Sequence, residues 1–140
     1  MKLIHAILLL VAISVSGCAI LHVKQYRIAG VTANSPDAVK LKVILQNVAD
    51  KTGLNDHTSD STMTNVFVFY AQSDVHNPPN LGAWFYQGDV WIQIFGGYGK
   101  PPAYKEANRL LQPMLRDEFG SRFSNPSEPF SRIESAPQKN

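Results

Sequence analysis

Two polar stretches of the sequence contain side chains that could bind a metal ion or transfer a proton, namely Asp56, His57, Asp60, Asp74 and His76. Imidazole and carboxylate groups are common zinc ligands and act as general acids and bases. The two stretches flank residues 65–71, which read as one strand, so they lie roughly 23 Å apart at about 3.3 Å per residue. Each half alone has too few ligands for a tight zinc site. We interpret these residues as solvated loops and expect no metal ion. A small enzyme or metal-binding protein using these loops stays the alternative.

A glycine-rich stretch, "GGYGKPP" at residues 96–102, could hold an anion. Glycines before a helix can present backbone amides to a phosphate group. A P-loop, however, needs Gly five residues before the G-K pair and Ser or Thr after it, and Ile94 and Pro101 occupy those positions. We interpret the stretch as a break between a strand and a helix. Its possible anion-binding residues are Gly97, Gly99 and Lys100. No G-x-S-x-G motif is present, and we expect a non-enzymatic protein without a cofactor.

Aromatic side chains are concentrated in the middle of the sequence, at Phe67, Phe69, Trp84, Tyr86, Trp91 and Phe95. Two helices can cover one face of a sheet, so the opposite face would carry some of these rings. They either fill a core under a loop or the tail, or they bind a partner, since Trp and Tyr are frequent in interfaces. The candidate partner-binding residues are Trp84, Tyr86, Trp91 and Phe95.

The single cysteine of the chain, Cys18, follows an apolar run. Lys2 places a positive charge near the start, and residues 4–15 are almost wholly apolar. That run is about a dozen residues, or roughly 18 Å as a helix, whereas a bilayer span needs about 20 residues. A charged start, a short apolar core and small residues before a cleavage point are typical of a secretory signal peptide.

The stretch Val15-Ser16-Gly17-Cys18 resembles the lipobox of bacterial lipoproteins, and this resemblance covers residues 1–18. It implies that residues 1–17 are removed and that Cys18 receives a diacylglyceryl group and an acylated amino group. At least two acyl chains give stable anchoring. Ala19, where Asp would retain the protein at the inner membrane, implies the outer membrane, with the domain facing the periplasm. The alternatives for Cys18 are a buried structural cysteine or a catalytic thiolate with His22 nearby.

The charge balance of the chain argues against nucleic acid as a partner. The chain has 13 Lys plus Arg against 11 Asp plus Glu, and loss of Lys2 leaves 12. Near neutrality without a basic cluster is unlike a nucleic-acid-binding surface. The partners that we expect are the membrane, through lipid on Cys18, and an envelope protein.

Two helices are predicted. The first lies between Ser35, a capping residue followed by Pro36, and Gly53, which suits the left-handed helix end. Between them, apolar residues recur with helical spacing at Ala38, Leu41, Ile44, Leu45 and Val48. The second helix covers residues 103–119, and Pro113 within it is expected to cause a kink.

Three strands complete the predicted core. Residues 65–71 are apolar on both faces, as in a central strand. Residues 81–87 and 90–95 flank Gly88-Asp89 as a hairpin. Residues 19–34 are a first strand or a tether, residues 55–64 a polar loop, and residues 121–124 a short edge strand.

We therefore expect an α+β fold, with an antiparallel sheet of about four strands and two helices packed on one face. Residues 1–17 would be a signal peptide, residues 18–34 the anchored lead-in, residues 35–124 the domain and residues 125–140 a disordered tail. The expected function is a lipid-anchored envelope lipoprotein that binds or helps to assemble a partner through a sheet face.

Overall fold

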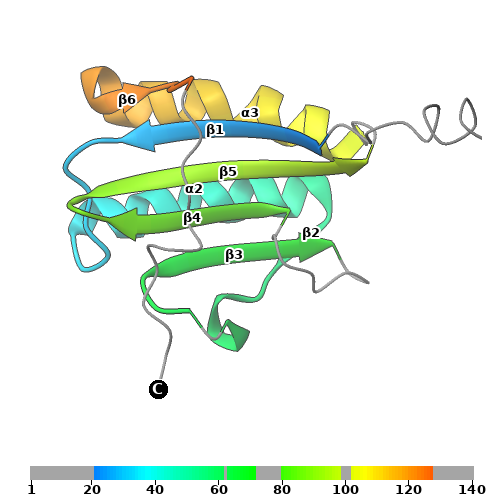
Figure 1. The fold of residues 1–140 in the computed structure, drawn as a ribbon, viewed down its shortest axis with the longest axis horizontal. Coiled ribbons are helices and arrows are strands. Elements are labelled where there is room, and N and C mark those ends of the chain that lie inside the picture. The colour runs from blue at the N-terminus through cyan, green and yellow to red at the C-terminus, as the bar shows by residue number, and fades with distance from the viewer. Residues whose placement is uncertain (1–20, 62, 72–79, 99–101, 128–140) are drawn as a thin grey trace, which may run out of the picture.

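The protein is an α+β sandwich of one sheet and one helical layer, as the sequence predicts (Figure 1). The computed structural model describes residues 21–61, 63–71, 80–98 and 102–127. Both helices pack on the same face of an antiparallel sheet. We call this the inner face, and the opposite one the outer face. The sheet has six strands, two more than the sequence indicates.

The two helices begin and end close to the predicted positions. Helix α2 spans Pro36–Thr52, the Oγ of Ser35 accepts from the amide of Ala38 at 3.3 Å, and Gly53 ends the helix with φ at 72°. Helix α3 spans Pro102–Phe119 and continues through Pro113.

The strands lie in the order β2-β3-β4-β5-β1-β6, and all neighbouring pairs are antiparallel. Short 3-10 turns, η1 (Thr58–Asp60) and η2 (Gly120–Arg122), precede β3 and β6. The strand bounds are β1 (Leu21–Ile28), β2 (Leu54–Asp56), β3 (Val66–Ala71), β4 (Leu81–Tyr86), β5 (Asp89–Tyr98) and β6 (Phe123–Ser124).

Three local predictions are wrong. The polar loop predicted at 55–64 begins with two residues of β2, because Leu54 is buried and pairs with Ala71. The break predicted at 96–102 begins later, since β1 is long enough to pair with β5 as far as Tyr98, with a bulge on the way. The hairpin turns at Gln87-Gly88 rather than Gly88-Asp89, because those two residues adopt positive φ of 51° and 83°, as a two-residue turn requires.

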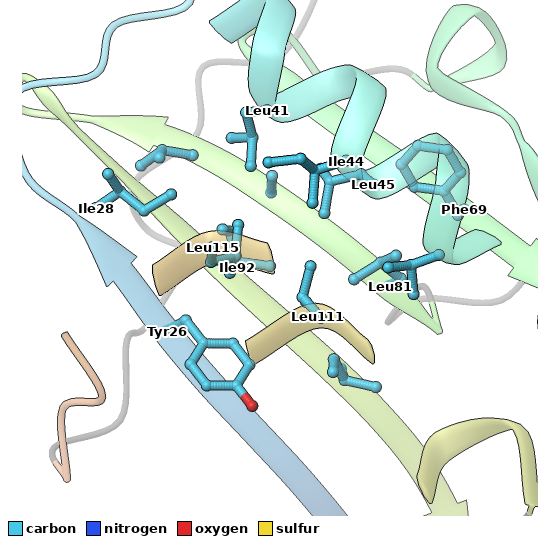
Figure 2. Packing of buried hydrophobic residues seen from close by; sticks show 14 of the residues in the cluster. Tyr26, Ile28, Leu41, Ile44, Leu45, Phe69, Leu81, Ile92, Leu111 and Leu115 are labelled. Atoms are coloured by element: carbon cyan, nitrogen blue, oxygen red, sulfur yellow. The ribbon is translucent and has the colours of Figure 1, made fainter. Parts of the chain in front are cut away.

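The main core lies between the helices and the inner face (Figure 2). Leu41 and Leu45 of α2 and Leu111 and Leu115 of α3 are fully buried. They pack over inner-face side chains from five strands, Tyr26, Ile28, Leu54, Phe69, Leu81, Ala83, Val90, Ile92 and Ile94. The hydroxyl of Tyr26 donates to Oδ1 of Asn108, and burial, with a smaller effect of Tyr104, raises the pKa of Tyr26 to about 12.

Ion pairs between the helices and their surroundings fix the helical layer. Nζ of Lys40 on α2 lies 2.9 Å from Oε1 of Glu118 on α3, and Nη1 of Arg122 in η2 lies 2.8 Å from Oδ2 of Asp37. Both pairs are partly exposed, so each contributes little to stability alone. They orient α2 against the end of α3.

Non-strand contacts close parts of both sheet edges. At the β3 edge, the amide of Val68 donates to Thr58 Oγ1 at 3.1 Å, and its carbonyl accepts from the amide of His57 at 2.9 Å. At the β1 edge, the amide of Ala29 donates to the carbonyl of Arg122 at 3.0 Å.

Candidate partner-binding face of the sheet

The outer face carries its own apolar cluster, which we call the outer cluster. Alternation along β3 points Val66, Val68 and Tyr70 to this face, while Phe67 and Phe69 point inward, as predicted. Trp84 of β4 and Phe95 of β5 complete the cluster. Val68 is 0% and Trp84 is 1% exposed. The sheet is therefore buried on both faces at its centre.

A glycine allows the largest ring of this cluster to lie against the sheet. Gly82 and Trp84 are two residues apart on β4 and so share the outer face. A Cβ placed on Gly82 would lie 2.1 Å from Cη2 of Trp84, so the indole occupies the space that a side chain at residue 82 would need. Gly82 pairs with Val68 on one side and Gln93 on the other. The Trp84 ring thus reaches back over the centre of the sheet.

A buried pair of amides continues the same row toward β1. Gln25 pairs with Gln93 in register, and Nε2 of Gln93 donates to Oε1 of Gln25 at 3.0 Å. Gln93 is 4% exposed and Gln25 is 8% exposed. This hydrogen bond reduces the cost of burying the two amides. Along this row the outer face thus changes from the apolar Val68 and Trp84 ring to the amides of Gln93 and Gln25.

One corner of the outer face combines aromatic and charged side chains, and we call Arg27, Tyr86, Asp89 and Trp91 the aromatic corner. Arg27 pairs with Trp91 and Tyr86 pairs with Asp89 in the sheet register. The Arg27 guanidinium lies 5.5 Å from the Trp91 ring centre, in cation–π range. Trp91 and Tyr86 are both partly exposed.

Asp89 holds the arginine of this corner in place. Its Oδ2 accepts from Nε of Arg27 at 2.8 Å, and its Oδ1 accepts from the amide of Gly30 at 2.9 Å. Partial burial opposes ionisation of Asp89, but the Gly30 amide and the Arg27 guanidinium outweigh it and hold the pKa of this carboxyl below its usual value. The corner therefore presents an oriented cation beside a partly exposed indole at neutral pH.

The four aromatic residues singled out from the sequence share the outer face but differ in burial. Trp84 and Phe95 lie in the outer cluster, whereas Tyr86 and Trp91 lie in the aromatic corner. Sequence reasoning missed Arg27, because its place beside Trp91 depends on the β1–β5 register. It also missed Gly82, although a glycine two residues before a tryptophan in a strand indicates a close approach.

The possible anion-binding residues do not form a described site. Gly97 lies within β5, between Phe95 and Tyr98, which both pair with β1, and so it is not at the start of a helix. Gly99 and Lys100 lie outside the described residues.

Those histidine and aspartate residues considered for the alternative function that the structure describes contact different side chains and do not converge on one site. Asp56 forms an ion pair with Lys42 at 2.9 Å. Partial burial of Asp56 is outweighed by hydrogen bonds from Thr58 and Lys42, which lower the pKa of its carboxyl. His57 Nδ1 lies 3.0 Å from Asp60, and its ring contacts Tyr70 edge-on. Asp74 and His76 fall outside the described residues, and the part that is described holds no group of three or more His, Cys, Asp or Glu able to bind a metal ion.

The predicted signal peptide and Cys18 lie outside the described residues. No helix among the described residues is both long and apolar enough to cross a membrane.

Searches against protein-family models, curated proteins and solved structures find no match to this chain.

Proposed function

We propose that this chain is a non-enzymatic, lipid-anchored lipoprotein of the bacterial envelope that binds a protein partner through the aromatic corner. The binding role is supported by one observation: Trp91, Tyr86 and Arg27 lie together on one partly exposed patch of the outer face. Trp, Tyr and Arg are the residue types most enriched in interface hot spots. An oriented arginine also loses less side-chain freedom when a partner binds.

The envelope location rests on the sequence around Cys18. The apolar run and "VSGC" support lipid attachment at Cys18, and Ala19 supports the outer membrane with the domain in the periplasm. The partner is then another envelope protein within reach of the anchored domain.

The anchor is tested by mass spectrometry of the protein purified from bacterial membranes. We expect a mature chain that begins at a lipid-modified Cys18. The Cys18→Ser variant should remain an unprocessed precursor. A native chain that begins at another residue, or that carries an unmodified Cys18 thiol, would contradict the lipoprotein assignment.

The partner-binding role is tested by cross-linking and pull-down with the full-length tagged protein from solubilised membranes. Trp91→Ala should reduce capture of a specific protein. The matched control is Val39→Ala, because Val39 is 67% exposed on α2, in the helical layer. Denaturant unfolding of both variants separates lost binding from lost folding. Equal capture by the wild type and Trp91→Ala would exclude the aromatic corner as the binding site.

A further inference from the structure

The outer cluster is buried although the helices lie on the other face of the sheet. Among the described residues, Met63 and His57 contact this cluster from the β3 side. Trp84, however, lies on β4 over Gly82, one strand further in. A sheet face turned to water is normally polar, whereas Val68 and Trp84 here are almost completely inaccessible. Something beyond the helical layer must therefore cover the centre of the outer face.

The chain leaves the described fold beside this face. Strand β6 runs antiparallel to β1, with Ser124 opposite Arg27. The side-chain amide of the next residue, Asn125, lies against the main chain of Gln25, and with its nitrogen turned toward the Gln25 carbonyl it donates there at 2.9 Å. The side chain of Gln25 belongs to the outer-face row that continues through Gln93 and Gly82 to Val68. A chain that continues from this point can cross the outer face without passing around the sheet.

Residues 128–140 are long enough for this path and have a suitable pattern. From β1 to β3 is three strand spacings, or about 14 Å. Pro129 and Pro137 favour an extended backbone of the polyproline II type, which has three residues per turn and about 3.1 Å rise per residue. In that conformation Phe130, Ile133 and Ala136 share one edge and span roughly 19 Å. Aromatic surfaces are established docking sites for such segments.

We propose that residues 128–140 of the same chain cover the outer cluster as an extended strap, with Phe130 and Ile133 packed toward Trp84. Residues 72–79 are the alternative cover, but the two residues that they join, Ala71 and Asn80, lie at the end of the β3–β4 pair away from Val66. The strap is proposed for the outer cluster alone. The proposal does not depend on the partner role of the aromatic corner.

The fluorescence of Trp84 depends on how well its ring is shielded from water, so it can test whether the strap covers the ring. Trp84 and Trp91 are the two tryptophans of the chain, so Trp91→Phe makes Trp84 the sole indole fluorophore. In this background, the full chain with Phe130→Ser and Ile133→Ser should show Trp84 emission at longer wavelength and stronger acrylamide quenching. The matched control, Ser131→Ala with Ser135→Ala, changes residues off the apolar edge and should leave both readings unchanged. Unchanged emission in a folded Phe130→Ser/Ile133→Ser variant would overturn the proposal.

A second measurement leaves Phe130 and Ile133 of the strap unchanged. A nitroxide attached to Ser135→Cys, in a chain with Cys18→Ala and Trp91→Phe, should quench Trp84 fluorescence because the strap lies against the ring. The same label at Asn47→Cys, an exposed position on α2, provides the comparison from the helical layer. Equal quenching from the two positions would show that another segment or a second copy covers Trp84, and would reject the strap.

Discussion

The two faces of one sheet are buried in different ways. The inner face is covered by the two helices, and its fully or nearly fully buried side chains are aliphatic apart from Tyr26 and Phe69. The outer face has a smaller cluster centred on one indole, a buried amide pair and a charged corner. The inner side therefore has the features of a folding core. The outer side combines a small core with side chains of the types found in binding interfaces, and the proposed binding residues are among them.

The sharpest test of this comparison is the free-energy cost of removing one large buried side chain from the core on each side of the sheet. Leu45→Ala should reduce the free energy of unfolding by about 2–5 kcal/mol, and Trp84→Ala by about 3–5 kcal/mol, because both residues are at most 1% exposed. Denaturant unfolding measures both. A cost below about 1 kcal/mol for Trp84→Ala would show that the outer cluster is a surface feature, not a second core.

The contact between Gly82 and Trp84 gives the next largest expected effect. Gly82→Ala should cost about 1–3 kcal/mol, because the new methyl group occupies the space of the Trp84 ring. In a Trp84→Leu background the same substitution should cost less, and the double-mutant cycle isolates the coupling. Additive effects of the two substitutions would indicate that the indole does not lie over Gly82.

Loss of the cap of α2 should affect the inner side alone. Ser35→Ala removes the side-chain acceptor for the Ala38 amide and should cost about 1 kcal/mol, as typical N-cap substitutions do. Ser59→Ala, an exposed residue in η1, is the control and should be close to neutral. Trp84 fluorescence should be the same in both folded variants. A change of Trp84 emission in Ser35→Ala would mean that the two sides are not separable.

The smallest expected effect concerns the pH dependence of the aromatic corner. The pKa of Asp89 is lower in the folded protein than its unfolded value of about 3.9. Its stabilising contribution is therefore complete above that value and is lost as the pH falls through the folded pKa. The difference in unfolding free energy between the wild type and Asp89→Asn should shrink as the pH is lowered from 7 to 3. A difference that is constant with pH would mean that the Asp89 charge does not hold Arg27.

Local patterns were sufficient for most of the fold. The cap at Ser35, the left-handed Gly53 and the apolar spacing from Ala38 to Val48 identify α2 almost to the residue. The alternation in β3 and β5 correctly separates the side chains of the two faces. Strand β2 could not be predicted, because three residues with one apolar side chain carry no periodic signal. It forms only because β3 provides a pairing partner.

The site was less predictable, because its properties depend on register. The sequence identifies Trp84, Tyr86, Trp91 and Phe95 as one aromatic group, but it does not show which rings are buried. That division follows from Gly82, which accommodates Trp84, and from the pairing of β1 with β5, which brings Arg27 to Trp91.

The short and partly closed sheet edges restrict how another protein can associate with this fold. One common mode is β-augmentation, in which a partner adds a strand through unpaired main-chain groups. Here the outermost strands, β2 and β6, span only three and two residues. Beyond β2, both main-chain groups of Val68 are already bonded to Thr58 and His57. Short, blocked edges also limit pairing between copies of a chain crowded on one surface. A protein that binds the described residues away from an open edge would do so through side chains on a face, and those side chains can change without altering the sheet.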